Sequence, residues 1–295
     1  METTNQTSKK VSVLGLGQMG YRIAQLYSKA GYEVTAWNRT PGKGKGLERV
    51  QLAETAEQAI LASPLVIAII LNNKGIFELL DGLTDTRIFT DKALVNFTSG
   101  STAEADSIEK RISDAGGAYI HGAIQASPEQ LGLKSATVVI SGNKGAFERY
   151  ENDLTIIGGK IRYLSDRAAA SLAMDTATST WVYGAFVGLL YGAELCRQYN
   201  LSLKDYADII GDISPEFIDY FKQEVMVVDR NDFRLTSSSV SLHLAVVQRL
   251  ADSFKDINVK QDFPTIIRDL LAEAEQKGFG EEELAAITKV IAPRK

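Results

Sequence analysis

A glycine-rich turn near the start of the chain constrains the fold more than any other feature. The apolar run VSVLGLG (11–17) is typical of a buried parallel strand, and it leads into an amphipathic helical pattern over 19–31. The turn between them reads Gly15, Leu16, Gly17, Gln18, Met19, Gly20. GxGxxG alone is a weak pattern, but between a strand and a helix it predicts a dinucleotide site with the pyrophosphate at the helix N-terminus. The alternative is a glycine turn with a purely structural role.

Apolar strands and helical patterns keep alternating through the first half of the chain. Further strands are expected at 33–38, 65–71, 93–97, 117–123, 136–141 and 160–164, with helical patterns around 54–62, 102–115 and 144–156. Such alternation produces crossover connections and a mainly parallel sheet. The sequence therefore predicts an α/β Rossmann domain.

Helical patterns alone follow Leu164. A long one runs from about 167 to 198, and shorter ones lie near 202–211, 215–228, 240–255, 264–277 and 281–291. We therefore predict an NADP-binding Rossmann domain over residues 1–165, an interdomain helix over 166–198 and an all-helical dimerisation and substrate domain over 199–295.

The residues after the second strand indicate which dinucleotide binds. NAD-binding proteins usually place an acidic residue there to bond the ribose 2′-hydroxyl. This chain has Asn38, Arg39 and Thr40, followed by Lys43, and its next carboxylate is Glu48. An arginine fork holds a 2′-phosphate well, so the sequence predicts NADPH as the cofactor. A solvated basic loop is the alternative.

Composition excludes several other classes of protein. The 295 residues carry a net charge of −5 with mixed signs, which does not suggest nucleic-acid binding. The single Cys196 and a polar start without a signal peptide predict a cytoplasmic protein. The uncharged run 176–193 is expected to be a core helix rather than a membrane span. Neither His121 nor His243 has neighbours at metal-ligand spacing, so no metal site is predicted.

A lone carboxylate, Asp175, lies in the middle of this small and apolar helical pattern. A buried carboxylate is costly unless it is paired, which favours a functional role over one in helix packing. Tyr183 follows two turns later on nearly the same face, with Ser179 between them. Tyr183 could donate a hydrogen bond or close a pocket, and an aromatic packing role is an equal alternative.

These features resemble the beta-hydroxyacid dehydrogenase superfamily, and within it the NADPH-dependent imine reductases. The resemblance covers nearly the whole chain and rests on GLGQMG (15–20), WNRT (37–40) with Lys43, LNN (71–73), NFTSGST (96–102), GAIQASPEQLG (122–132) and the Asp175 helix. It implies a helical domain like the C-terminal domain of 6-phosphogluconate dehydrogenase. It also implies a homodimer with exchanged helical domains, in which each active site combines the cofactor domain of one chain with the helical domain of the other.

The absence of a lysine separates the subfamilies. Hydroxyacid members carry a catalytic lysine on the interdomain helix, whereas this chain has no lysine between Lys160 and Lys204. Imine reductases carry Asp, Tyr or Asn in that region, and Asp175 falls in this register. The chain departs from their usual pattern at Met174, at Gln125, where methionine is usual, and in the helix start 165–169, which lacks the usual glycine.

The resemblance and the residues together predict NADPH-dependent reduction of cyclic imines. Asp175 would stabilise the cationic nitrogen or relay a proton, with Tyr183 as the second catalytic candidate. The remaining site candidates are Leu71, Asn72, Thr98 and Ser99 for the cofactor, and Gln125, Ser179 and His243 for the substrate pocket. A hydroxyacid or semialdehyde reductase and a non-catalytic NADP-binding protein are the alternatives. The sequence does not indicate whether Asp175, Tyr183 or water delivers the proton.

Overall fold

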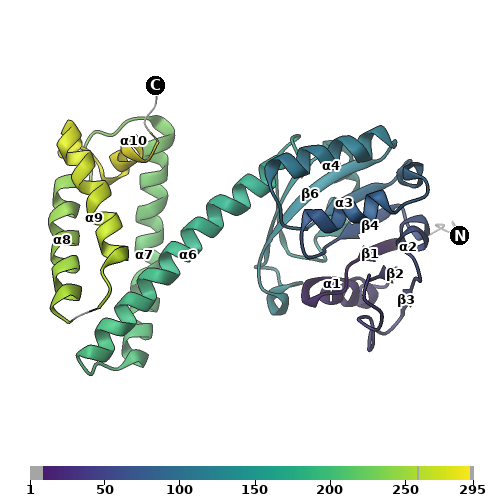
Figure 1. The fold of residues 1–295 in the computed structure, drawn as a ribbon, viewed down its shortest axis with the longest axis horizontal. Coiled ribbons are helices and arrows are strands. Elements are labelled where there is room, and N and C mark those ends of the chain that lie inside the picture. Colours follow the sequence, from purple (N-terminus) through teal and green to yellow (C-terminus); the bar gives the residue numbers. More distant parts are fainter. Residues whose placement is uncertain (1–8, 258, 293–295) are drawn as a thin grey trace, which may run out of the picture. The chain divides into compact units, whose positions relative to one another are not determined.

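The structure is a computed structural model that describes residues 9–257 and 259–292. The chain divides into two compact units, with the boundary between Thr180 and Trp181. Helix α6 (Ala169–Gln198) begins in the first unit and ends in the second (Figure 1). The predicted domain limits enclose this helix, whereas the boundary between the compact units falls inside it.

The first unit is built on one eight-stranded sheet. Its strands are β1 (Lys10–Leu14), β2 (Glu33–Trp37), β3 (Val50–Leu52), β4 (Leu65–Ala68), β5 (Ala93–Asn96), β6 (Ala118–Gln125), β7 (Thr137–Gly142) and β8 (Lys160–Ser165). Their order is β3-β2-β1-β4-β5-β6-β7-β8, and every described pairing is parallel except that of β6 with β7. The predicted Rossmann fold with a mainly parallel sheet is confirmed.

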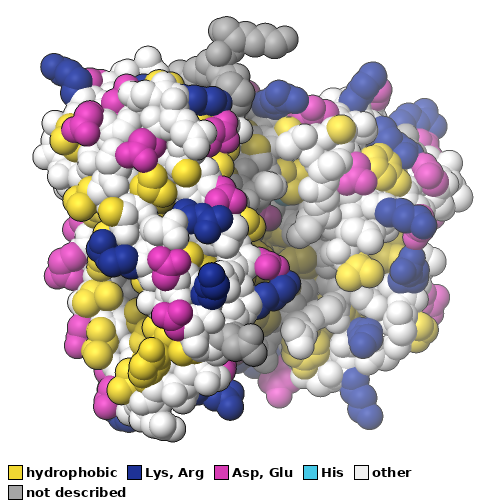
Figure 2. Space-filling model, turned by 60° about the vertical axis from the view of Figure 1, so that its left-hand side comes forward, with side chains coloured by type: hydrophobic (Ala, Val, Ile, Leu, Met, Phe, Trp, Pro, Cys, Tyr) yellow, Lys and Arg dark blue, Asp and Glu magenta, His cyan; other side chains and the backbone are white. Residues whose placement is uncertain are grey.

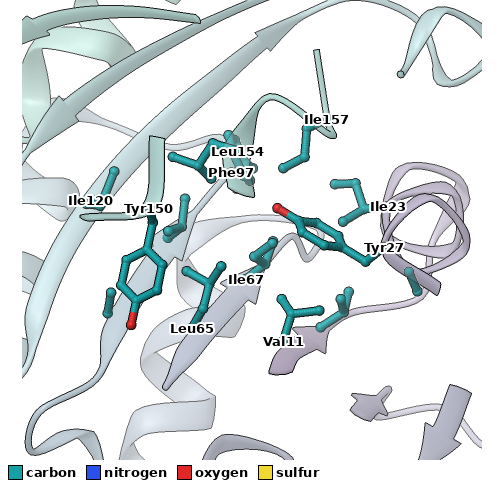
Figure 3. Packing of buried hydrophobic residues seen from close by; sticks show 14 of the residues in the cluster. Val11, Ile23, Tyr27, Leu65, Ile67, Phe97, Ile120, Tyr150, Leu154 and Ile157 are labelled. Carbon is teal, nitrogen blue, oxygen red and sulfur yellow. The ribbon is translucent and has the colours of Figure 1, made fainter. Parts of the chain in front are cut away.

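Helices cover both faces of this sheet. They are α1 (Gln18–Lys29), α2 (Ala56–Ala62), α3 (Asn73–Asp81), α4 (Thr102–Asp114) and α5 (Lys144–Leu154), with short 3₁₀ turns η1 (Thr86–Phe89) and η2 (Pro128–Gln130). Successive strand residues point to opposite faces, so β4 sends Leu65 and Ile67 into one core and Val66 and Ala68 into the other. Helices α1 and α5 pack on the first core, which Figure 3 shows, and α2, α3 and α4 pack on the second.

Strand β3 and helix α3 of this unit were not predicted from the sequence. Strand β3 is three residues long, too short to produce an alternating pattern. The apolar residues continue to Leu71, so the sequence predicts a strand over 65–71. In the structure the strand stops at Ala68, Leu71 is 88% exposed, and helix α3 begins at Asn73. Asn72 caps α3 by accepting a 3.1 Å hydrogen bond from the Gly75 N–H.

The second unit is helical, as predicted. After α6 it contains α7 (Leu203–Arg230), α8 (Val240–Asp256), α9 (Asp262–Ala274), the π-helix η3 (Glu275–Phe279), the 3₁₀ turn η4 (Leu284–Ile287) and α10 (Thr288–Ile291). The predicted break between 211 and 215 is wrong, because α7 continues through Pro215. A proline inside a helix costs about 3 kcal/mol or more, so Pro215 weakens the middle of α7.

A buried carboxylate fastens the helical unit. Glu283 is fully buried, and its oxygens accept hydrogen bonds from the backbone N–H groups of Thr236, Ser237 and Ser238 and from the Thr236 hydroxyl. Burial alone would raise the pKa of Glu283, but these donors together lower it below its usual value. The ionised side chain therefore joins the segment before α8 to the segment before η4.

Helix α6 is less buried than the sequence predicts. Its buried residues are Ala169, Ser171 and Leu172, and Trp181 and Phe186 are 54% and 53% exposed. The prediction of a core helix is therefore wrong for the single chain, because no described segment covers these side chains. On the face of the molecule that Figure 2 shows, exposed apolar side chains are interspersed with charged side chains of both signs. Among the described residues, no helix is long and apolar enough to cross a membrane.

Candidate active site

The glycine turn after β1 has the geometry that close backbone approach requires. Gly15 has φ +100°, and a Cβ there would lie 2.2 Å from the Ile69 carbonyl oxygen. A Cβ on Gly20 would lie 1.9 Å from the Gly15 carbonyl oxygen. By contrast, a Cβ on Gly17 would have no atom within 4 Å. The lack of a side chain at Gly15 and Gly20 therefore allows the backbone of the turn to pack closely. Gly17 leaves open space beside the backbone, as a pyrophosphate needs.

The start of α1 is suited to an anion. Gly17 is the N-cap residue and contributes no side-chain hydrogen bond, and the first turn, which includes Gln18 and Met19, contains no acidic residue. Free N–H groups and the helix dipole therefore face an open region without a competing carboxylate. These features fit the pyrophosphate of a dinucleotide.

The loop after β2 is tied to the glycine turn. The Asn38 side-chain oxygen accepts a 2.8 Å hydrogen bond from the Leu16 N–H, and its amide nitrogen donates to the Thr40 carbonyl oxygen at 2.9 Å. Arg39 is largely exposed and pairs with Glu78 of α3 at 2.8 Å. Lys43 is exposed nearby in sequence. The loop therefore offers cationic donors to a 2′-phosphate. Glu78, the ion-pair partner of Arg39, was not identified from the sequence.

A cleft of about 300 Å³ lies at the carboxyl ends of β4, β5 and β6, beside the start of α6. Its lining residues are Met19, Ile69, Ile70, Phe97, Thr98, Ser99, His121, Gly122, Ala123, Ile124, Leu172 and Asp175. Ligands of open α/β sheets bind outside the carboxyl ends of the strands. This cleft is therefore the candidate active site. Another cavity, of about 320 Å³, lies at the amino ends of β5 and β6, away from the glycine turn.

Thr98 and His121 hold the wall of the cleft together. Thr98 is fully buried, and its hydroxyl accepts a 3.0 Å hydrogen bond from the Ile70 N–H. The His121 Nε2 lies 3.2 Å from the Thr98 carbonyl oxygen, and its Nδ1 lies 2.8 Å from the Ser171 hydroxyl. A carbonyl only accepts, so Nε2 carries the proton and Nδ1 accepts from Ser171. Burial lowers the pKa of His121 to about 4, which keeps the ring neutral.

Asp175 lies at the edge of the cleft on α6. It is half-buried, and its Oδ1 accepts a 2.7 Å hydrogen bond from the Gln125 amide nitrogen at the end of β6. The Thr178 hydroxyl lies 2.9 Å from the Gln125 oxygen. Gln125 itself does not line the cleft. The structure therefore brings together two predicted site residues fifty positions apart, with Gln125 contacting the carboxylate from outside the cleft.

The remaining predicted site residues are near the start of α3, on α6 and on α8. Leu71 and Asn72 are exposed at the start of α3, and Ser179 is half-buried one turn after Asp175. Tyr183 belongs to the second compact unit and is 70% exposed. His243 lies on α8 in the same unit, with its Nε2 3.5 Å from the Tyr220 hydroxyl. No group of three or more potential metal ligands occurs among the described residues.

Two buried asparagines that the sequence analysis did not single out support the loops of the site. Asn96 donates to the Asn73 side-chain oxygen at 3.2 Å and to the Tyr119 hydroxyl at 2.9 Å. Its own oxygen accepts from the Thr98 N–H at 3.0 Å. The loops after β4 and β5 are therefore joined through amide side chains. The position of Asn96 at the carboxyl end of a buried strand was the available signal.

Comparisons with known proteins agree with this geometry. Residues 10–165 match the family described as the NAD binding domain of 6-phosphogluconate dehydrogenase. Residues 166–293 match the NADPH-dependent reductive aminase-like C-terminal domain. The chain belongs to the imine reductase and reductive aminase family.

Individual members of this imine reductase family match over nearly their full length. The chain is 27% identical over 286 residues to an NADPH-dependent reductive aminase of Aspergillus oryzae, covering 95% of this chain and 96% of that protein. The structure of an imine reductase from Pseudomonas sp. gives a TM-score of 0.91 at 28% identity, covering 97% of this chain and 100% of that one.

A reductive aminase from Aspergillus terreus was solved with NADPH4, cyclohexanone and allyl amine. It gives a TM-score of 0.88 at 26% identity, covering 97% of this chain and 100% of that one. As a member of the imine reductase family, the protein is an NADPH-dependent oxidoreductase. The predicted family, fold and enzyme class are confirmed, and the hydroxyacid alternative is not supported.

Proposed function

We propose that this protein reduces small cyclic imines and iminium ions to amines, with NADPH as its cofactor. The observation that carries the proposal is the carboxylate of Asp175 at a cleft formed by the loops after β4 and β5, with no lysine from 161 to 203. A carboxylate stabilises a cationic nitrogen, whereas a lysine ammonium would repel it. The matches to imine reductases and reductive aminases support the same chemistry.

The chain's own residues provide the parts of a cofactor site. Gly17 and the N-terminus of α1 would hold the pyrophosphate, and Arg39, Thr40 and Lys43 would hold the 2′-phosphate. The backbone of Thr98 and Ser99 would contact the nicotinamide ribose. Bound NADPH would supply the hydride that adds to the imine carbon.

Within the cleft, Asp175 would face the substrate nitrogen and stabilise the iminium cation that accepts the hydride. The apolar lining residues Ile124 and Leu172 would exclude water around the reacting atoms. Tyr183 follows Asp175 by eight residues on α6, and we propose that it donates a hydrogen bond to the substrate or covers it. His243 belongs to the helical unit, and this unit of a second copy would close the cleft.

The proposed homodimer is supported by an exposed apolar ridge on α7. Ile209, Ile213, Phe217, Phe221 and Val225 follow one another at intervals of four residues, and each is between 41% and 65% exposed. Side chains at this spacing form the ridges that pack into grooves of another helix. Contiguous apolar surface of this kind marks a protein interface. Cytoplasmic location, predicted from the sequence, remains a prediction.

Turnover of defined substrates tests the proposal. The purified protein is mixed with NADPH and 2-methyl-1-pyrroline, and with NADP⁺ and a 3-hydroxy acid, and the absorbance of the reduced cofactor is followed. We expect loss of NADPH and formation of 2-methylpyrrolidine with the imine, and no reduction of NADP⁺ with the hydroxy acid. Oxidation of the hydroxy acid would instead identify a hydroxyacid dehydrogenase, and NADPH binding without turnover of either substrate would identify a non-catalytic protein.

A further inference from the structure

The contact between Gln125 and Asp175 gives the amide a defined orientation. The Gln125 amide nitrogen is 2.7 Å from Asp175 Oδ1. If the amide were rotated by 180°, its oxygen would face the carboxylate oxygen at that distance, with no donor between them when Asp175 is ionised. The Thr178 hydroxyl lies 2.9 Å from both the Gln125 oxygen and the Met174 carbonyl oxygen, so it fits this orientation without deciding it. The ionised carboxylate therefore selects a Gln125 that donates to it.

This contact gives the two carboxylate oxygens of Asp175 different surroundings. Oδ1 accepts from an N–H donor that cannot itself accept, so a proton on Oδ1 would point at the amide hydrogens. Oδ2 receives no hydrogen bond from the described part of the chain. The amide therefore supports the ionised carboxylate through one oxygen and leaves the other oxygen for a ligand.

The surroundings of Asp175 contain little that could replace this contact. The cleft has two titratable lining residues, Asp175 and His121. Burial lowers the pKa of His121 to about 4, so the imidazole is neutral at physiological pH and supplies no compensating positive charge. Gln125 on β6 and Thr178 on α6 are polar but uncharged. The negative charge of Asp175 is thus without a protein cation in the cleft.

We propose that Gln125 is a positioning residue that holds Asp175 as an anionic counter-ion, so that the site selects substrates whose nitrogen arrives already positive. The inference rests on the proposed function and goes beyond it, because it names the charge state of the preferred substrate. Strongly basic alkyl iminium ions match such a site. Weakly basic aryl imines, which must receive their proton inside the cleft, do not.

A pair of matched substrates tests this inference. 2-Methyl-1-pyrroline needs a proton for reduction, whereas its N-methyl iminium counterpart, 1,2-dimethyl-1-pyrrolinium, carries a permanent positive charge. We expect the wild-type protein with NADPH to reduce both, with a kcat for the permanent cation that stays level between pH 5.5 and 8. His121 keeps one charge state over this range, because its pKa is lowered to about 4.

Gln125→Met removes the donor and keeps a side chain of similar length. We expect its kcat/KM to fall about tenfold for the permanent cation and less for 2-methyl-1-pyrroline, because the carboxylate is no longer held in place and only the second substrate can hold it through its own N–H. Thr178→Val is the second variant. It leaves the Gln125 donor in place and should produce a smaller effect of the same form.

The outcomes separate the inference from the function on which it rests. If Gln125→Met lowers kcat/KM equally for both substrates, Gln125 has only a structural role and the inference is wrong. Turnover of 2-methyl-1-pyrroline without turnover of the permanent cation by the wild-type protein would also overturn it, while leaving imine reduction intact. Failure of the wild-type protein with both substrates would contradict the proposed function itself. Thermal unfolding curves of each variant confirm that it is folded.

Discussion

Arg39 and Glu78 form an ion pair in which Nη1 and Oε2 are 2.8 Å apart, linking the loop after β2 to helix α3. Both side chains are largely exposed, so the pair itself contributes little stability. Its importance lies in position, because it holds the guanidinium near the end of β2, where dinucleotides place the adenosine ribose.

Replacing Arg39 with alanine should impair NADPH use selectively. A hydrogen bond to a charged group is worth about 1.5–3 kcal/mol, so the Kd for NADPH should rise by roughly 10- to 100-fold. The Kd for NADH, which lacks the 2′-phosphate, should change little. Titration of the cofactor fluorescence measures both. Glu78→Gln is the matched control, since it breaks the ion pair but keeps the guanidinium, and NADPH should bind it at least as tightly. Equal weakening of both cofactors by Arg39→Ala would show that Arg39 is structural.

Removing the Asp175 carboxylate should slow hydride transfer without unfolding the protein. Asp175→Ala is expected to lower the single-turnover rate with 2-methyl-1-pyrroline by about 10²–10⁴-fold, the range for a positioned proton-transfer group. Asp175→Asn keeps the size of the side chain but removes its charge, and it should retain partial activity. Tyr183→Phe should lower this rate less than Asp175→Ala if Asp175 is the main proton source. A wild-type rate for Asp175→Ala at every pH would mean that the carboxylate only packs the helix.

Buried His121 should make the sheet unit sensitive to acid. Its pKa is lowered from 6.5 to about 4, so the unfolded chain takes up a proton near pH 6.5, whereas the folded chain does so only near pH 4. The contribution of neutral His121 to the free energy of unfolding is therefore fully present above pH 6.5. It is lost as the pH falls towards 4, by about 3 kcal/mol in total at 1.36 kcal/mol per pKa unit. His121→Gln cannot titrate and should show a shallower dependence of the free energy of unfolding on pH.

Urea unfolding can measure this effect in the sheet unit alone. The protein contains two tryptophans, Trp37 on β2 and Trp181 on α6, so a Trp181→Phe background leaves Trp37 as the fluorescent reporter. Transitions are compared with and without His121→Gln from pH 4 to pH 7.5. Parallel pH dependences in the two proteins would show that His121 does not cause the acid sensitivity.

A charge in the α7 ridge should separate the proposed dimer. Phe217 is in the middle of the ridge and 51% exposed, and Phe217→Glu would bury a carboxylate without a partner at the interface. Sedimentation should show a shift towards monomer, with imine turnover lost and NADPH binding kept. Leu61→Glu is the control, because Leu61 is 59% exposed on α2 in the other unit. An active wild-type monomer at assay concentration would contradict the shared site.

The architecture could be predicted because each local signal agreed with the others. The GxGxxG turn follows an apolar run and opens a helix with Ile23, Ala24 and Tyr27 on its buried face. The reversal at β7 could not be predicted, since its apolar residues would suit either direction. Nor could the continuity of α7, because Pro215 is a strong local signal for a break.

The site was predictable residue by residue but not as a set of contacts. Gln125 and Asp175 were both selected from the sequence, yet nothing in it indicates that they form a hydrogen bond across fifty residues. The same separation hides the bond between His121 and Ser171. Glu78 gave no signal because an acidic residue on an amphipathic helix is ordinary. Such contacts depend on how β6, α3 and α6 are placed by the sheet.

The passage from one compact unit to the other occurs inside α6, between Thr180 and Trp181, and not in a loop. Neither half can therefore be produced alone by cutting at a natural linker. A cut at this boundary would expose the broken ends of a helix, with four unsatisfied backbone groups on each side. Gene fusions, tags and split-protein designs would have to keep α6 whole, and grafting the helical half onto another cofactor domain would require matching the helical phase residue by residue.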